Sequence, residues 1–230
     1  MEGISSLVTF MIITKIEQQK RHPGRVNIFL DDEFAFGLHK EVVVRFGLRR
    51  GDELTKENID RITSSEEQAL AKQKALQLLH YRMRSEHELR AKLFEKEFPP
   101  EAIDPVIEEL RTSGLIDDLK FARAVIHDAQ LKQPTGKYRL QQKLRSKGIA
   151  SSIINTVLTE IFSEDDETTA ALAAAKKQLR RYSQSRKPVE SQELPKRIAR
   201  YLAQRGFRWS SISAALKKVF NNHDSLMKEE

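Results

Sequence analysis

Residues 137–161 read KYRLQQKLRSKGIASSIINTVLTEI, and this stretch decides the fold. Its apolar positions recur at helical spacing, which places each group on one face of a helix. They are Leu140, Leu144, Ile149, Ile153, Val157 and Ile161. Gly148 sits between the two groups and can adopt the left-handed conformation that ends a helix. The stretch therefore predicts two short helices separated by a tight turn.

Two other stretches repeat this pattern, which makes the protein a tandem repeat. Residues 86–110 read EHELRAKLFEKEFPPEAIDPVIEEL, and residues 194–220 read LPKRIARYLAQRGFRWSSISAALKKVF. The matching apolar positions are Leu89, Leu93, Phe98, Ile103, Ile107 and Leu110 in the first, and Ile198, Leu202, Phe207, Ile212, Leu216 and Val219 in the third. A further helix is predicted before each pair, over residues 68–82, 120–131 and 169–182. Each repeat is therefore expected to contain three helices.

The expected fold class is mainly α, with three tandem three-helix repeats at 65–118, 119–166 and 167–230. A unit of about fifty residues buries only a thin core, so repeats should pack in series into an elongated, curved body. Two polar segments, 163–167 and 183–193, are the expected breaks around the first helix of the third repeat.

The first 64 residues predict a small α/β module instead. Residues 12–19 and 26–30 are rich in strand formers and flank the turn-forming His22-Pro23-Gly24. A third strand is expected over 34–38, a helix over 40–46, and a second helix from Thr55 to about residue 62. The module should thus hold three short antiparallel strands and two helices, with residues 1–10 as an extension that carries no chemistry.

The composition excludes several classes of chemistry. The 230 residues include no cysteine, which rules out disulfides, thiolate nucleophiles and cysteine-bound metals. The six histidines are scattered, and no metalloprotease, phosphate-loop or nucleophile-elbow motif is present. We expect no catalytic residue, no metal and no cofactor. The apolar run 7–13 is too short for a membrane span, so neither a signal peptide nor a membrane anchor is expected.

One acidic pair, Asp117-Asp118, invites comparison with a metal-dependent nuclease. Such sites need several convergent acids from separate elements, and none can be identified here. Gly114 can end one helix, and either aspartate can cap the next, which carries Phe121. We therefore interpret the pair as a helix cap, with an enzyme as the alternative.

The charge distribution is the strongest functional signal. The net charge is +7, but residues 119–230 hold 22 basic and 11 acidic side chains, whereas residues 1–67 hold 10 and 12 and residues 68–118 hold 8 and 10. Concentrated positive charge favours an anionic partner, most simply a nucleic acid backbone. A solvated basic surface is the alternative.

The candidate binding residues come from basic runs in the second and third repeats. They are Lys137, Arg139, Lys143, Arg145, Lys147, Lys176, Arg180, Arg197, Arg200, Arg205 and Arg208. Helical spacing places Arg139, Lys143 and Lys147 on one face. No base-reading pattern accompanies them, so contacts to phosphates should be independent of sequence and should weaken steeply with salt.

Three motifs together resemble the RecX family of regulatory proteins. They are YRMRSEHELRAKL from Tyr81, GLIDDLKFAR from Gly114 and GKYRLQQKLRSKGI from Gly136. The resemblance is strong over residues 68–162 and looser to about residue 220. It implies a cytoplasmic bacterial protein without enzymatic activity that binds the RecA filament on single-stranded DNA and lowers its ATPase and strand exchange. Roles in DNA repair, recombination and the SOS response would follow.

The sequence also departs from that family's pattern. Residues 85–118 hold ten acids against four bases, and FPPEAI replaces the glycine turn that the second repeat keeps as KGIASSI. The first repeat is therefore expected to face basic RecA surfaces rather than DNA. We further expect a monomer that binds duplex DNA more weakly than single strands. The alternative function is a sequence-nonspecific DNA-binding or transcriptional protein built from helix-turn-helix-like repeats.

Overall fold

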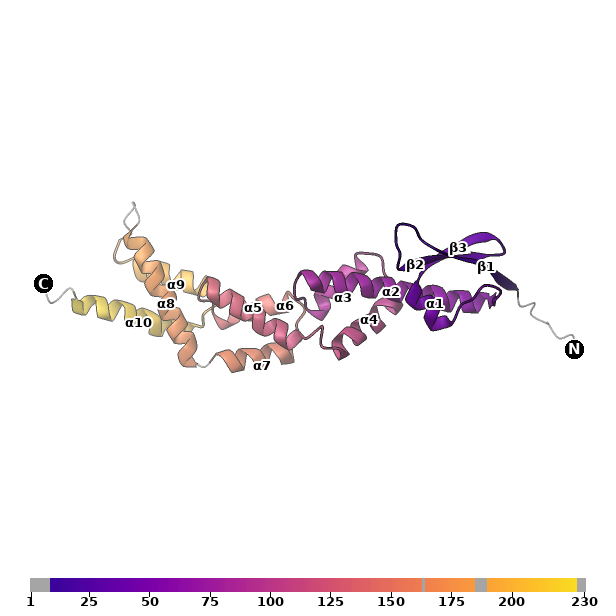
Figure 1. Ribbon diagram of the computed structural model, residues 1–230. Helices are drawn as coiled ribbons and strands as arrows, with labels where there is room; N and C mark the ends of the chain where they lie inside the picture. Colours follow the sequence, from indigo (N-terminus) through magenta and orange to yellow (C-terminus); the bar gives the residue numbers. More distant parts are fainter. Residues whose placement is uncertain (1–8, 163, 185–189, 227–230) are drawn as a thin grey trace, which may run out of the picture. The chain divides into compact units, whose positions relative to one another are not determined.

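The computed structural model describes residues 9–162, 164–184 and 190–226, which form ten helices and four strands (Figure 1). The chain divides into two compact units. The first comprises Met1–Met83 and Leu89–Leu115, and the second comprises Arg84–Glu88 and Ile116–Glu230. The mainly helical fold and the N-terminal sheet that the sequence predicts are confirmed.

The first unit begins with an antiparallel sheet in the order β3-β2-β1-β4. Its strands are β1 (Phe10–Gln18), β2 (Arg25–Leu30), β3 (Glu33–His39) and β4 (Glu53–Thr55). Asp31 and Asp32 join β2 to β3 with φ values of 49° and 70°, the positive values that a tight two-residue hairpin turn requires. The sequence predicts three strands, and β4 is a fourth that pairs with the start of β1.

One face of the sheet forms the core of this module with helices α1 (Lys40–Phe46) and α2 (Lys56–Tyr81). Ile13, Ile28 and Leu38 are fully buried there, because alternate residues of a strand point to the same face. Phe10 is already the first residue of β1, so the extension expected over 1–10 is shorter than predicted, and residues 1–8 lie outside the described part.

Helix α2 is one continuous helix of 26 residues, where the sequence predicts two separate ones. Thr55 caps it by accepting a hydrogen bond from the backbone N–H of Asn58 at 3.2 Å. No glycine or proline interrupts residues 56–81. The helix consequently runs through residue 64, the expected end of the N-terminal module, and continues as the first helix of the first repeat.

The first repeat adds α3 (Glu86–Phe94) and α4 (Pro100–Thr112), and α4 packs against α2. Its predicted core residues are buried, with Phe98 only partly covered. Glu97 adopts φ = 65° in the turn between α3 and α4. A non-glycine residue in this conformation is strained, because its Cβ crowds the following carbonyl.

The second and third repeats form most of the second unit. The second contains α5 (Asp118–Lys132), α6 (Lys137–Arg145) and α7 (Ser151–Ile161), and the third contains α8 (Glu164–Ser183), α9 (Leu194–Gln204) and α10 (Trp209–Leu226). Each repeat encloses its own apolar cluster. Gly148 and Gly206 adopt φ = 74° and 81° in the turns, which confirms the predicted left-handed glycines.

Two details of these repeats differ from the prediction. The same offset of 51 residues relates Leu89 to Leu140 before the turn and Ile103 to Ile154 after it, so Ile154 is buried in the core where the sequence predicts Ile153. Ile161, which is also predicted to be a core residue, is 37% exposed. Helix α8 also starts earlier than expected, and Glu167 is a buried residue of that helix rather than part of a linker.

Candidate anion-binding surface

All eleven predicted binding residues lie in the second unit, and the structure separates them into groups. Arg139, Lys143 and Arg205 line one hollow, and Arg197 and Arg200 line another. Lys147 and Arg208 form ion pairs within the protein. The others, Lys137, Arg145, Lys176 and Arg180, line neither of these hollows.

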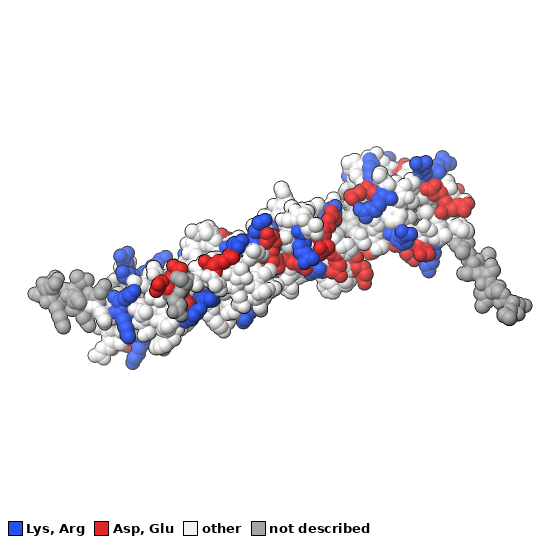
Figure 2. Space-filling model, turned by 90° about the horizontal axis from the view of Figure 1, so that it is seen from below, with Lys and Arg blue, Asp and Glu red and all other residues white. Residues whose placement is uncertain are grey.

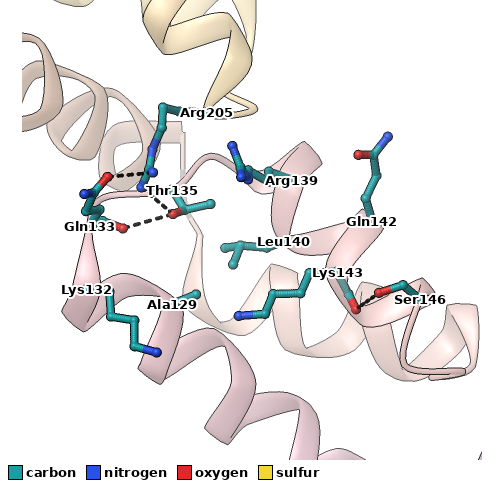
Figure 3. Close-up of a pocket in the computed structure, with 10 residues that line it drawn as sticks. All are labelled: Ala129, Lys132, Gln133, Thr135, Arg139, Leu140, Gln142, Lys143, Ser146 and Arg205. Carbon is teal, nitrogen blue, oxygen red and sulfur yellow. Dashed lines mark hydrogen bonds between the residues drawn. The ribbon is translucent and has the colours of Figure 1, made fainter.

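The first hollow, which we call the α5–α6 hollow, lies between the end of α5 and the exposed side of α6. It has a volume of about 640 Å³, and its lining includes four basic side chains and no acid. Lys132 and Lys143 extend into it from the two helices, while Arg139 and Arg205 lie along its rim (Figure 3). Because no carboxylate neutralises these charges within the hollow, it is suited to an anionic ligand.

Arg205 differs from the other cations of this hollow because its guanidinium is held in place by hydrogen bonds. It donates to Oε1 of Gln133 at 2.7 Å and to Oγ1 of Thr135 at 2.9 Å (Figure 3). It also donates to the carbonyl oxygen of Pro134 at 2.7 Å. All these acceptors are uncharged, so the positive charge is retained. Arg205 therefore provides a fixed cation and also ties the end of α9 to the segment before α6.

The second hollow, which we call the α8–α9 hollow, occupies the matching place in the third repeat. Its volume is about 400 Å³, and its lining comprises Tyr182, Glu193, Lys196, Arg197, Arg200, Tyr201 and Gln204. Arg197 is paired with the carboxylate of Glu193 at 2.9 Å. Lys196 and Arg200 are exposed. This hollow is thus cationic too, although one acid lies within it.

Lys147 and Arg208 have structural partners that the sequence did not reveal. The ammonium of Lys147 lies 2.6 Å from Oε1 of Glu88, and Nε of Arg208 lies 3.3 Å from Oε2 of Glu167. The predicted common face of Arg139, Lys143 and Lys147 therefore holds two cations at the hollow and a third that is engaged elsewhere. Lys132, which was not among the predicted residues, takes its place at the hollow.

These partners belong to a set of contacts that occurs twice in the second unit, and we call each set an inter-repeat joint. In the first, Oγ of Ser85 donates to the carbonyl of Lys147 at 2.6 Å, and the N–H of Glu86 donates to Oδ1 of Asp118 at 2.9 Å. Asp118 is the first residue of α5, so a carboxylate from the first helix of the second repeat caps the middle helix of the first repeat.

The second joint has the same form, displaced along the chain. The N–H of Gly136 donates to the carbonyl of Arg205 at 2.9 Å, and the N–H of Lys137 donates to Oε1 of Glu167 at 3.3 Å. Gly206 packs against this helix start, since a Cβ at this glycine would lie 2.6 Å from the Cβ of Arg139. The glycine turn is therefore required for close approach as well as for its backbone conformation.

The pair Asp117-Asp118 is occupied by such capping. Asp117 caps α5 by accepting from the backbone N–H of Lys120 at 2.9 Å, and this hydrogen bond holds the pKa of Asp117 below its usual value. Burial raises the pKa of the Asp118 carboxyl, against the opposing effect of the Glu86 N–H. Among the described residues, no group of three or more histidine or acidic side chains could hold a metal ion.

The surface charge follows the same division along the chain. In the view of Figure 2, the second unit shows separate patches of Lys and Arg side chains with a few acidic side chains among them, and the first repeat shows a larger group of acidic side chains. Within the described part, no helix is long and apolar enough to cross a membrane. The fold and the site define a class: a protein of tandem three-helix domains whose later repeats carry a cationic surface.

Comparison with known proteins identifies the family within that class. The regulatory protein RecX N-terminal domain matches residues 11–55, and the first, second and third three-helix domains of RecX match residues 71–110, 117–158 and 165–216. The chain belongs to the RecX family of regulatory proteins.

Whole-chain relatives agree with this assignment. Regulatory protein RecX of Clostridioides difficile is 36% identical over 91% of this chain and 96% of its own length, and that of Bacillus subtilis is 35% identical over 94% and 81%. A crystal structure of regulatory protein RecX superposes with a TM-score of 0.72 at 32% identity, covering 88% of this chain and 97% of that one. RecX from Lactobacillus salivarius, at 21% identity and a TM-score of 0.60, shares the fold.

Proposed function

We propose that this protein is a non-catalytic regulator that binds the RecA filament on single-stranded DNA and inhibits or tunes its ATPase and strand exchange. The α5–α6 hollow carries the proposal, because it combines four basic side chains with no acid in its lining. Membership of a family of regulatory proteins supports a regulatory role. The proposal includes a cytoplasmic monomer divided into an N-terminal module at 1–64 and repeats at 65–118, 119–166 and 167–230.

The contact to DNA is assigned to phosphates rather than bases. Lys132, Arg139 and Lys143 present ammonium and guanidinium groups, which bind phosphate oxygens in any sequence. Single strands should bind more tightly than duplex, since a flexible strand can adapt its backbone to the positions of these cations. The capping roles of Asp117 and Asp118 support a protein without nuclease activity.

The test is co-sedimentation with RecA assembled on single-stranded DNA, read alongside the RecA ATPase. The triple variant Lys132→Gln/Arg139→Gln/Lys143→Gln should bind the filament at least about tenfold more weakly, because each lost phosphate contact removes one released counterion. The slope of log affinity against log salt should become shallower by about 2 to 3. Lys147 is kept, since its loss would disturb an internal ion pair. Because Arg139 also donates to the carbonyl of Gln204, the double variant Lys132→Gln/Lys143→Gln is measured beside the triple one and should show the same direction of change.

A matched control removes the same charges from the first unit. Lys20, Arg21 and Lys56 are exposed, and changing all three to Gln lowers the net charge equally. This control should leave filament binding and ATPase unchanged. Equal losses of filament affinity in both variants would show that binding depends on total charge and not on the α5–α6 hollow. DNA binding without any effect on RecA would instead favour the sequence-nonspecific DNA-binding alternative.

A further inference from the structure

The third repeat is the last one in the described part of the chain, and its middle helix has the surface that the joints use in the other two repeats. Offsets of 51 and 58 residues relate Glu88 to Arg139 and Arg139 to Arg197. Glu88 contacts Lys147 of the next repeat, and the guanidinium of Arg139 donates to the carbonyl of Gln204 at 3.0 Å. Arg197, the third of these equivalent residues, pairs with Glu193 of its own repeat.

The α8–α9 hollow is the same surface, with no following repeat within the described residues. Arg139 and Gln142 line the α5–α6 hollow, and their counterparts Arg197 and Arg200 line the α8–α9 hollow. In the second repeat, Arg205 from the next repeat closes one side of the hollow. No equivalent side chain closes the hollow of the third repeat within the part of the chain that is described.

The two joints indicate the chemistry that this surface accepts. At both, the middle helix receives a carboxylate, from Asp118 or from Glu167, and its first residues approach a turn that offers backbone carbonyls. These are groups of a polypeptide. At the third repeat Pro195 stands in place of Glu86 and Lys137 and has no backbone N–H to donate, so a carboxylate would be bound by side chains instead. Lys196, which replaces His87 and Tyr138 of the earlier repeats, adds a cation there.

We propose that the α8–α9 hollow docks an acidic segment of a partner protein, with carboxylates bound by Lys196, Arg197 and Arg200. Charge complementarity selects this occupant, since the lining carries three cations against the single acid Glu193. Arginine binds carboxylates in a bidentate manner that suits such a contact. Tyr182 and Tyr201 pack partly on the core of the repeat and also line the hollow, where their hydroxyl groups can form hydrogen bonds with a ligand.

The joints argue for polypeptide over nucleic acid, because the middle helices of the two earlier repeats approach carboxylates and backbone carbonyls of this chain. Glu193 opposes any anion, so it makes this hollow less positive than the α5–α6 hollow. The α5–α6 hollow has no acid in its lining, and it remains the site assigned to nucleic acid. The proposal deepens the proposed function if the partner is RecA, but the docking site does not depend on that identity.

The experiment measures two ligands on the same set of full-length variants by fluorescence anisotropy. The probes are a labelled synthetic peptide of alternating glutamate and glycine, and a labelled oligothymidylate. Lys196→Gln/Arg200→Gln should weaken binding of the peptide about fivefold or more and leave oligothymidylate binding within about twofold. Lys132→Gln/Lys143→Gln should show the reverse.

A charge-matched control lies in the same repeat. Lys217 and Lys218 of α10 are exposed and line neither hollow, so Lys217→Gln/Lys218→Gln should leave peptide affinity unchanged. Circular dichroism should show the same helix content in all variants. Failure of the peptide to bind at low salt, an equal loss in the α10 control, or a loss confined to oligothymidylate for the α9 variant would each overturn the proposal. None of these outcomes depends on RecA, so the proposed function is tested separately.

Discussion

The first and second repeats are built on the same helical plan but differ at their turns. Residue 97 of the first repeat corresponds to Gly148 of the second, and both adopt a positive φ. Gly148 packs against His87, so closely that a Cβ there would lie 2.2 Å from the Cβ of that histidine. Glu97 is exposed and needs no such space. The comparison shows that the glycine is required by the joint, whereas the turn alone tolerates a side chain.

The surfaces of the two repeats differ in the same way. Core positions coincide along α3 and α6, where Leu89 and Leu93 correspond to Leu140 and Leu144, all of them buried. At the surface, Phe94 and Glu95 of the first repeat correspond to Arg145 and Ser146 of the second, and all four are exposed. Apolar spacing therefore fixes the fold, and the exposed positions remain free to select a partner.

The largest expected effect comes from placing a side chain in a joint. Gly206→Ala should lower the free energy of unfolding by about 3 kcal/mol, because it adds a strained left-handed residue and a clash with the start of α6. Chemical denaturation measures it. Gly24→Ala is the control, since a Cβ at Gly24 meets no atom within 4 Å. Similar losses in both would show that the close approach at Gly206 has no energetic role.

Removing the fixed guanidinium should have the next largest effect. Arg205→Gln should cost about 2 kcal/mol of unfolding free energy, because acceptors at Gln133, Pro134 and Thr135 lose their charged donor. Arg200→Gln, on the exposed side of α9, should leave the free energy of unfolding unchanged. If both variants are equally stable, Arg205 is a surface cation like the others.

Relieving the strain in the turn of the first repeat should increase the stability of the protein. Glu97→Gly should raise the free energy of unfolding by about 0.5–1 kcal/mol, since glycine adopts the left-handed conformation without the steric cost. Lys96→Gly provides the contrast. Lys96 is not among the residues of positive φ, and there glycine adds only flexibility to the unfolded chain and should destabilise. The difference between the thermal midpoints of the two variants tests whether Glu97 is strained.

The smallest effect is a pH dependence of opposite sign at two neighbouring residues. The pKa of Asp117 is lowered in the folded protein, so its contribution to stability is lost as pH falls through the folded pKa. The pKa of Asp118 is raised, so its contribution is present at low pH and is lost as pH rises through the folded pKa.

Two asparagine variants separate these contributions. Between about pH 3 and pH 7, Asp118→Asn should gain stability relative to the parent protein as pH rises, and Asp117→Asn should lose it. Urea denaturation at both pH values measures the difference. A shift of the same sign in both variants would contradict the separate capping roles of the two carboxylates.

The repeat pattern could be predicted from the sequence because helices, turns and cores depend on near neighbours. Spacings of three and four residues located the helices, and Gly148 and Gly206 located the turns. Strand β4 was missed, since three residues are too few to show an alternating pattern. The sequence predicts two helices where α2 is continuous, because the apolar positions of α2 do not follow one stripe: one part packs on the sheet and another on α4.

The binding surface was predictable in location but not in detail. The basic runs pointed to the second and third repeats, and the structure gathers Arg139 and Lys143 into one hollow with Lys132. Sequence alone could not distinguish these from Lys147, whose carboxylate partner lies 59 residues away. Glu167 was missed because a buried acid in an acidic segment resembles a solvated one.

The inter-repeat joint has a consequence for how such chains change in length. A block that begins at Asp118 and ends before Glu167 contains both sides of a joint. Its carboxylate and glycine turn contact the repeat before it, and the start of its middle helix contacts the repeat after it. Duplication or deletion of that block would keep the backbone and capping contacts of each joint, but it would exchange the side-chain pairs, because after duplication Arg139 rather than Glu88 would face Lys147. Gain or loss of whole repeats therefore preserves the backbone frame of the joints and requires changes of side chain only, whereas a break in the middle of the block would leave two unmatched ends.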